Sequence, residues 1–291
     1  MAREISTHKI ASLAPFELAE PRALAEAIAL LQAREGTVRP MAGGTALMLM
    51  MKAGVLRPTR LVNLRRLGLD QLEVDARGAL RVGAMVTLRS LETSPVVRKG
   101  WPVVARTLRT LSNVRVRNVA RIGGHLAHGD PHMDLPPLLA ALGASVTIAG
   151  PRGERSCPLE DLYAGYLETT LAPGELITRV SVPPMDGRRA AYLKCTTRSA
   201  DDWPALGMAV VLDGDAPRIF VSAATDKPTR LSAVEKILSV RAIDERLLDQ
   251  AARAAQDVHI EGDLHGSAAY KKHLVGVYLR RAIHEARQPS R

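Results

Sequence analysis

The chain has 291 residues, of which 46% are hydrophobic and 24% charged, a balance that is ordinary for a globular protein and allows two domains. Only 3% of the residues are aromatic, which disfavours single-stranded nucleic-acid binding because that function depends on stacking platforms. The net charge of +10 is spread out without a run of five or six like charges, so it indicates no nucleic-acid arm and leaves an acidic partner, an anionic cofactor or an anionic membrane face open.

The first part of the chain, about residues 1–57, reads as helix, strand, glycine turn and helix. Pro21 opens a helical pattern that Gly36 ends, the usual placement of these two residue types. A short strand over Val38–Ala42 runs into Gly43-Gly44-Thr45, and the following LMLMMK continues as a helix. The character of the sequence changes around Arg57-Pro58, where we expect a subdomain boundary.

The second part, residues 58–183, is predicted to be mixed, with two hairpin turns that glycine marks. The expected elements are strands over 61–64 and 72–84 that turn at Ala76-Arg77-Gly78, helices near Leu88–Glu92 and Val103–Leu111, a long loop over Arg121–Pro131, a helix over 135–143, a hairpin around Pro151-Arg152-Gly153 and a strand over 176–183.

A domain boundary is predicted at Pro183–Arg189, and residues 184–291 form the last part. We expect three strands, over 191–197, 207–214 and 217–225, and then three helices, over 231–239, 243–258 and 268–286. Strands followed by helices, without alternation of the two, indicate an α+β fold.

The two cysteines, Cys157 and Cys195, are isolated from each other. They cannot supply the four ligands of an iron–sulfur cluster or a Cys₄ zinc site, and they form no disulfide framework. The N-terminus lacks the apolar core of a signal peptide, and no apolar stretch reaches the ~20 residues that span a bilayer. We therefore expect a cytoplasmic protein without a transmembrane segment.

The first candidate motif, Met41-Ala42-Gly43-Gly44-Thr45, lies between a predicted strand and a predicted helix. Glycine permits positive φ and close approach to a ligand, and free amides at a helix start bind anions such as a diphosphate. The motif is not the G-x-G-x-x-G dinucleotide fingerprint. A tight turn without any ligand is the alternative interpretation.

The second candidate motif is the segment RIGGHLAHGDPHMDLPP, from Arg121 to Pro137. It combines a second glycine pair with a dense group of polar side chains, which is unusual for a plain connection. A metal site is one interpretation; the competent ligands are His125, His128, Asp130, His132 and Asp134. The histidine spacing differs from that of a helical zinc site, so a ligand-binding loop is favoured, and a plain loop stays open.

The two glycine pairs together suggest more than either pair alone. The diphosphate of a dinucleotide needs several main-chain donors, and two glycine turns that meet in space would supply a nest of them. This argues for a large anionic cofactor.

The segments AGGTALMLMMK, LRVGAMVTLRSLETSPVV, VRNVARIGGHLAHGDPHMDLPPLLAALGA, GELITRVSVP and AYLKCTTR, in this order, resemble one known family. It is the FAD-binding medium subunit of molybdenum hydroxylases, of the carbon monoxide dehydrogenase and xanthine dehydrogenase type. The resemblance implies an FAD-binding domain of the vanillyl-alcohol-oxidase (PCMH) type, over 1–183, followed by a C-terminal domain with a three-stranded sheet and a three-helix bundle, over 184–291.

The resemblance also implies an oxidoreductase complex, as a dimer of heterotrimers. A large subunit would carry molybdopterin, where the substrate is oxidised, and a small subunit would carry two [2Fe–2S] clusters that pass electrons to FAD in this chain. The alternatives are a flavin-free scaffold subunit of the same type of complex and a self-sufficient flavin oxidase. The second is disfavoured because no pocket signature of acid, base and aromatic residues stands out.

Carried over by resemblance, two segments and three single residues would contact FAD. They are Met41, Ala42, Gly43, Gly44, Thr45, Ala46 and Leu47; Arg121, Ile122, Gly123, Gly124 and His125; and Asp134, Ile177 and Lys194. Arg121, His125 and Ala46 depart from the residues that the family usually has at these positions.

Overall fold

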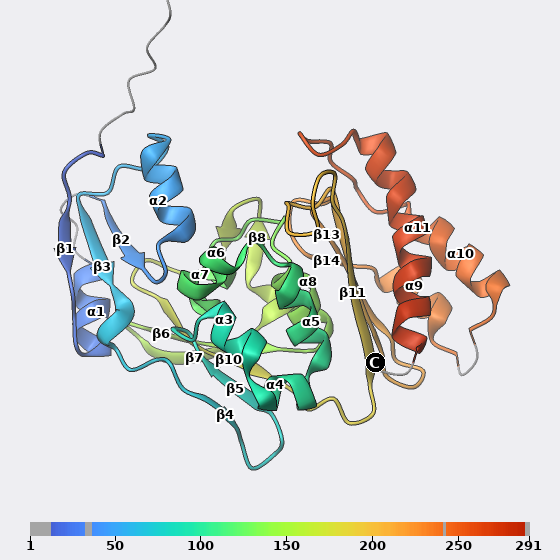
Figure 1. The fold of residues 1–291 in the computed structure, drawn as a ribbon, viewed down its shortest axis with the longest axis horizontal. Coiled ribbons are helices and arrows are strands. Elements are labelled where there is room, and N and C mark those ends of the chain that lie inside the picture. The colour runs from blue at the N-terminus through green and yellow to red at the C-terminus, as the bar shows by residue number, and fades with distance from the viewer. Residues whose placement is uncertain (1–12, 33–36, 241–242, 289–291) are drawn as a thin grey trace, which may run out of the picture.

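The computed structural model describes residues 13–32, 37–240 and 243–288, and it shows three units in a row along the long axis (Figure 1). The predicted helix end at Gly36 and the N-terminal twelve residues lie outside these ranges. Within them, no helix is both long and apolar enough to cross a membrane.

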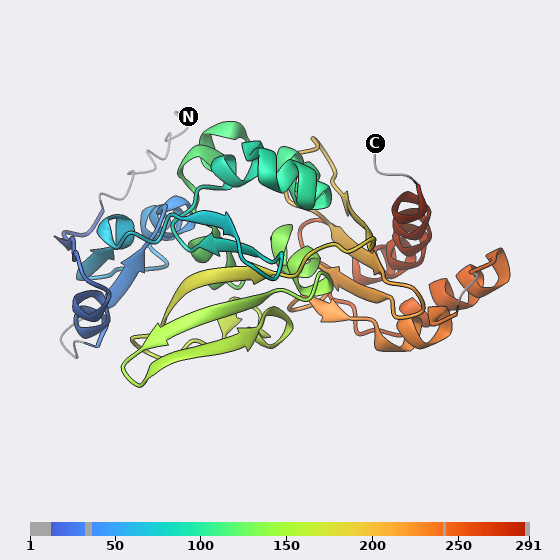
Figure 2. The same cartoon turned by 90° about the horizontal axis from the view of Figure 1, so that it is seen from below.

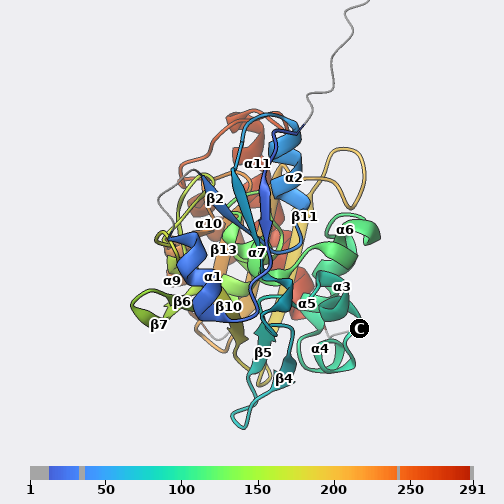
Figure 3. The same cartoon turned by 90° about the vertical axis from the view of Figure 1, so that its left-hand side faces the viewer.

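The N-terminal unit, which faces the viewer in Figure 3, is a small parallel sheet with one helix near each end. The strand order β1-β3-β2 and the helix between β2 and β3 make a β-α-β crossover, which the sequence did not predict. The elements are β1 (Glu17–Ala19), α1 (Leu24–Leu31), β2 (Val38–Met41), α2 (Thr45–Lys52), β3 (Arg60–Asn63) and the 3₁₀ turn η1 (Leu64–Arg66).

The central unit is an antiparallel sheet in the order β4-β5-β10-β6-β7. Helices lie on one side of it, and the β6–β7 hairpin forms one of its edges (Figure 2). Its strands are β4 (Leu72–Val74), β5 (Leu80–Gly83), β6 (Ser145–Gly150), β7 (Gly153–Pro158), β10 (Leu176–Val182) and the small pair β8 (Tyr163–Gly165) and β9 (Glu168–Thr169). Its helices are α3 (Leu88–Thr93), α4 (Pro95–Gly100), α5 (Pro102–Thr110), α6 (Val114–Val119), α7 (Ile122–Ala127), α8 (Leu135–Ala141) and η2 (Leu159–Asp161).

The C-terminal unit is an antiparallel sheet covered by helices. It holds four strands in the order β11-β12-β13-β14, so the expectation of three strands missed the two-residue β14. The elements are β11 (Arg189–Cys195), β12 (Leu206–Leu212), β13 (Arg218–Ser222), β14 (Thr229–Arg230), α9 (Ser232–Leu238), α10 (Glu245–Ala255) and α11 (Ala268–Arg287).

Strand β12 explains how the central and C-terminal units share one core. Every residue of LGMAVVL is buried, because α8 packs on one face of the sheet and α11 on the other. Ala209 and Val211 belong to the apolar core of the central unit, whereas Met208 and Val210 belong to the core under the C-terminal helices. A strand buried on both faces reads as a continuous apolar run, without the alternation of a half-exposed strand.

Both predicted hairpin turns are present. β4 pairs with β5 and β6 with β7, and Gly78 and Gly153 have positive φ of 77° and 100°. The predicted loop over Arg121–Pro131 is wrong in its first half, because α7 occupies Ile122–Ala127. The predicted domain boundary falls in the connection between β10 and β11.

Candidate functional site

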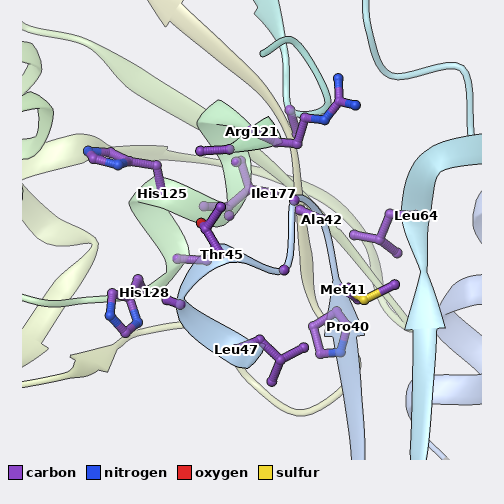
Figure 4. Close-up of a pocket in the computed structure, with 18 of the residues that line it drawn as sticks. Pro40, Met41, Ala42, Thr45, Leu47, Leu64, Arg121, His125, His128 and Ile177 are labelled. Carbon is purple, nitrogen blue, oxygen red and sulfur yellow. The ribbon is translucent and has the colours of Figure 1, made fainter. Parts of the chain in front are cut away.

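A cavity of about 320 Å³ lies where the N-terminal unit meets the central unit (Figure 4). Its walls come from the β2–α2 turn, the segment after β5, the start of α7 and the start of β10. The lining residues are Arg39, Pro40, Met41, Ala42, Gly43, Gly44, Thr45, Ala46, Leu47, Met50, Leu64, Ala84, Met85, Ala120, Arg121, Gly123, Gly124, His125, Ala127, His128, Met133, Leu176 and Ile177.

The first glycine pair forms the turn between β2 and α2. Gly44 has φ of 70°, in the left-handed region that favours glycine. Gly43 is required for another reason, since a Cβ there would lie 2.3 Å from the carbonyl oxygen of Val119. One glycine therefore makes the turn and the other lets the turn pack against the end of α6.

This turn presents a row of free backbone donors. Among the described residues, no acceptor takes a hydrogen bond from the amides of residues 43–47, and the first helical bond of α2 runs from Met48 N to Gly44 O at 2.9 Å. The first amides of any helix lack partners within the helix, and together they favour an anion. All five of these residues line the cavity.

The second glycine pair lies in the first turn of α7. The amides of Ile122 and Gly123 donate to Val86 O at 3.1 Å and to Ala84 O at 2.9 Å, which fixes the helix start on the segment after β5. A Cβ on Gly123 would lie 2.6 Å from that of Ala84, so this glycine serves close packing. The amide of Gly124 has no acceptor within the described ranges.

The two glycine pairs meet, as we expected from the sequence for a diphosphate nest. A Cβ on Gly124 would lie 3.0 Å from the Cβ of Ala42, and both residues line the cavity. The free amides of the β2–α2 turn and of Gly124 therefore border one space. The arrangement offers main-chain donors to an anionic group.

Twelve of the fifteen predicted site residues line the cavity. They are Met41, Ala42, Gly43, Gly44, Thr45, Ala46, Leu47, Arg121, Gly123, Gly124, His125 and Ile177. The other three lie elsewhere: Ile122 is buried in the core of the central unit, and Asp134 and Lys194 meet each other at the junction with the C-terminal unit.

Several lining residues were missed. Met50 follows Leu47 by three positions and His128 follows Gly124 by four, so helical periodicity beyond each motif could have indicated both. Met85 and Met133 come from other segments of the chain, and nothing in the sequence connects them with the glycine pairs.

Two side-chain nitrogens at this wall have no partner among the described residues: Arg121 Nε and His125 Nε2, both buried. Arg121 is anchored by Nη1, which donates to Met85 O at 2.9 Å. Burial, together with the neighbouring His128, lowers the pKa of His125 to about 3, so the imidazole is neutral at physiological pH. Figure 4 shows the two side chains on opposite sides of Thr45, which leaves the centre of the turn to main-chain donors.

Asp134 and Lys194 form a buried ion pair, with Lys194 Nζ 3.0 Å from Asp134 Oδ2. Tyr192 OH donates to Asp134 Oδ1 at 2.7 Å, and Lys194 Nζ also donates to the carbonyl oxygens of Thr110 and Asp202. Burial raises the pKa of Asp134, although Lys194 and Tyr192 act in the opposite direction. The pair joins the N-cap of α8 to β11, and so joins the central and C-terminal units.

The histidines of the second motif have separate environments. In the part of the chain that the structure describes, no three His, Cys, Asp or Glu side chains gather as a metal site would require. His132 contacts Asp130 and Asp263, at 2.9 and 2.7 Å. His125 and His128 lie at the cavity.

Comparison with known proteins identifies the family. The family described as the FAD binding domain in molybdopterin dehydrogenase matches residues 14–185, more than half of the chain. This chain belongs to that family. The CO dehydrogenase flavoprotein C-terminal domain matches residues 191–286 of the same chain.

Relatives match over nearly the whole length. The carbon monoxide dehydrogenase medium chain of Afipia carboxidovorans is 32% identical, over 94% of this chain and 96% of that protein. The nicotine 6-hydroxylase medium subunit of Paenarthrobacter nicotinovorans is also 32% identical, over 94% and 98%. A crystal structure of Cu,Mo-CO dehydrogenase superposes with a TM-score of 0.89 at 32% identity, over 94% of this chain and 98% of that one.

Membership confirms the family, the fold class and the FAD cofactor that the sequence predicted. The chain is an FAD-binding subunit of a molybdopterin-type oxidoreductase, with a PCMH-type domain followed by a C-terminal flavoprotein domain. The cavity at the two glycine pairs lies within the FAD-binding match.

Proposed function

We propose that FAD lies in the cavity between the N-terminal and central units, with its diphosphate on the amides of residues 43–47 and of Gly124. The observation that carries the proposal is the convergence of these unpartnered amides on one space, at two glycine pairs far apart in the chain. A Cβ at position 124 would narrow this space, so glycine at this position leaves room for the diphosphate.

The remaining predicted residues take supporting roles in this proposal. Met41, Leu47 and Ile177 give the cavity apolar surface. Arg121 and His125 each bring a buried nitrogen to its border, and neither nitrogen has a partner among the described residues. Asp134 and Lys194 neutralise each other at the junction of the two domains, next to the lining residue Met133. The sequence-based assignment of both to the cofactor itself stays a prediction.

FAD supplies the ability to take up electrons and release them to an acceptor, which no side chain offers. The share of this chain is to bind and orient the cofactor and to shield part of it from water. Both cysteines are buried and isolated, so they offer no cluster relay of their own.

The complex is inferred from the relatives, which are named as medium chains or medium subunits. We infer a large molybdopterin subunit and a small subunit with two [2Fe–2S] clusters as partners, in a cytoplasmic dimer of heterotrimers. Electrons would enter this chain from the clusters and leave it for an external acceptor. We also propose the division into an FAD-binding domain over 1–183, with subdomains near 1–57 and 58–183, and a C-terminal domain over 184–291.

Flavin content tests the cofactor site directly. The purified full chain should release one FAD on denaturation, or take one up on titration, with a flavin absorbance spectrum. FMN is the matched control, because it shares the ring system but lacks the diphosphate and should bind much more weakly. A colourless chain that takes up no FAD would favour the flavin-free scaffold.

An anaerobic experiment tests the role within the complex. Aldehydes, purines, N-heterocycles or carbon monoxide are supplied to the FAD-loaded chain alone, and then again with the large and small subunits present. Bleaching of the flavin should require the partner subunits, since no second cofactor motif is present in this sequence. Substrate-dependent bleaching of the chain alone would make it a self-sufficient flavin oxidase.

A further inference from the structure

His132 lies between two carboxylates from different units of the fold. Its backbone amide and its Nδ1 contact Asp130 Oδ1 at 2.8 and 2.9 Å, which closes a tight turn within one segment. Its Nε2 contacts Asp263 Oδ2 at 2.7 Å, in the turn that precedes α11 of the C-terminal unit. One imidazole thus connects two units with both of its nitrogens.

These contacts are part of a closed ring. Lys271 Nζ, on α11, lies 2.7 Å from Asp263 Oδ2 and donates to Ala223 O at 2.7 Å. The amide of Ala223 donates to Pro131 O at 2.9 Å, which returns the path to the residue before His132. We call Asp130, His132, Asp263, Lys271 and Ala223 the junction ring.

The junction ring is largely buried and its charges balance. The side chains of Lys271, Asp130 and His132 are only 1%, 7% and 10% exposed. Buried ionised groups persist only when they are paired, and two carboxylates balance one ammonium and one protonated imidazole. Burial alone would lower the pKa of His132, but the carboxylates of Asp130 and Asp263 raise it above 6.5 and favour that protonated form.

The segment that the ring fixes also forms a wall of the cavity. His128 and Met133 line the cavity, and they flank Asp130 and His132 on both sides. Asp130 is itself buried, with 6% of its surface exposed, and Pro131 O accepts from the amide of Ala223, so the segment is held from both the cavity side and the C-terminal unit. A displacement of the ring would therefore displace the wall.

We propose that His132 is a positioning residue, which fastens the 128–133 wall of the cavity to the C-terminal unit and thereby couples that unit to FAD binding. The inference rests on the proposed function, because it takes the occupant of the cavity to be FAD. By linkage, the coupling acts in both directions: the C-terminal unit affects FAD affinity, and FAD affects the stability of the junction.

The variant His132→Phe removes both nitrogens and keeps a ring beside Trp203, whose centroid lies 5.5 Å away. The variant His132→Gln keeps a donor that reaches toward Asp263. His265→Phe is the matched control, since the same exchange is made 5.3 Å from His132 at a ring that pairs with no carboxylate among the described residues. We expect the FAD dissociation constant of the full chain to rise about tenfold in His132→Phe, within the usual range of coupling between sites. It should return most of the way in His132→Gln and stay unchanged in His265→Phe.

FAD affinity measured as a function of pH adds a readout that would not change if the role of His132 were merely structural. Asp130 and Asp263 contact His132 directly, and the ring of His265 lies 5.3 Å away. His128 acts on Asp130 and Lys271 pairs with Asp263, so both act on the carboxylates that face His132. FAD affinity of the wild-type chain should weaken as His132 loses its proton, and His132→Phe should lack this step.

The outcomes separate the two proposals. Wild-type affinity in a destabilised His132→Phe variant would overturn the positioning role, whereas a wild-type chain that binds no FAD would overturn the proposed function first. If His132→Phe does not fold, amide hydrogen exchange of the wild-type chain, measured with and without FAD, tests the coupling instead. FAD should slow amide exchange at residues 263–266 as well as at 43–47, and protection confined to 43–47 would contradict the coupling.

Discussion

Ala42 and Gly124 face each other so closely that a Cβ on Gly124 would lie 3.0 Å from the Cβ of Ala42. The first residue belongs to the turn before α2 and the second to the first turn of α7. Both residues line the cavity, and this approach brings the free amides of both turns to one space. Any larger side chain at position 124 must enter the space that we assign to the diphosphate.

Exchanging Gly124 for Asp should therefore weaken FAD binding strongly. The carboxylate would lie within a few ångströms of the diphosphate, and repulsion at that distance near a protein surface corresponds to a loss of affinity of about a hundredfold or more. Titration of the apoprotein with FAD measures the effect.

Gly100→Asp is the control for this variant. Gly100 ends α4 and is remote from the cavity lining, and a Cβ there would meet no atom within 4 Å, so the same charge change should leave FAD affinity unaltered. Unchanged flavin occupancy in Gly124→Asp would place the diphosphate elsewhere.

Removing one member of the Asp134–Lys194 pair should destabilise the chain much more than removing both. Lys194→Met leaves a buried carboxylate without its cation, and breaking a buried pair in this way typically costs about 3–5 kcal/mol. The double variant Asp134→Leu with Lys194→Met removes both charges and should recover most of the free energy of unfolding. Chemical denaturation of the wild type, the two single variants and the double variant gives the coupling free energy between the two residues. Additive losses of the free energy of unfolding would show that the pair contributes little.

The stability contributed by His132 should decline at alkaline pH. Its folded pKa lies above the ordinary 6.5, so its contribution is complete below pH 6.5 and is lost as the pH rises through the folded value. Each unit by which the pKa is raised is worth about 1.4 kcal/mol. The difference in Tm between wild type and His132→Phe should thus be largest between about pH 5 and 6.5 and shrink above it. A difference that grows with pH would contradict the assigned protonation.

The histidines of the second motif should hold no metal. His132 is engaged by two carboxylates, and His125 and His128 border the FAD cavity. Elemental analysis of chelator-washed protein should find no stoichiometric zinc, iron or nickel. One tightly held metal ion per chain would overturn the assignment of this segment.

Local sequence signals located the glycine pairs but misjudged the geometry of the second pair. Gly44 makes a turn through its positive φ, as expected of a glycine between strand and helix. Gly123 and Gly124 read as a turn for the same reason, yet they lie in a helix, where they allow close approach to Ala84 and Ala42. Sequence does not distinguish these two uses of glycine, because one depends on the local backbone and the other on distant neighbours.

The junction ring was beyond sequence reasoning for a related reason. His132 and Asp130 stood out as polar residues of an unusual segment, but Asp263 and Lys271 lie in a turn and a helix that carry no motif. Their contact is created by the packing of α11 on the C-terminal sheet, a relationship between elements far apart in the chain. Similarly, β14 is too short to leave a periodic signal.

The cavity is walled by two sheets that share no strand, and this has a consequence for the lifetime of the protein in the cell. A cofactor that touches both walls stabilises their docking by mass action, so the segment over 67–71 that joins the two sheets would be less protected when the cavity is empty. Gly68 and Asp70, both exposed in this segment, would be an early point of proteolytic attack on the empty chain. The supply of flavin would then limit how much of the chain is assembled, because chains without cofactor would be degraded before they reached their partners.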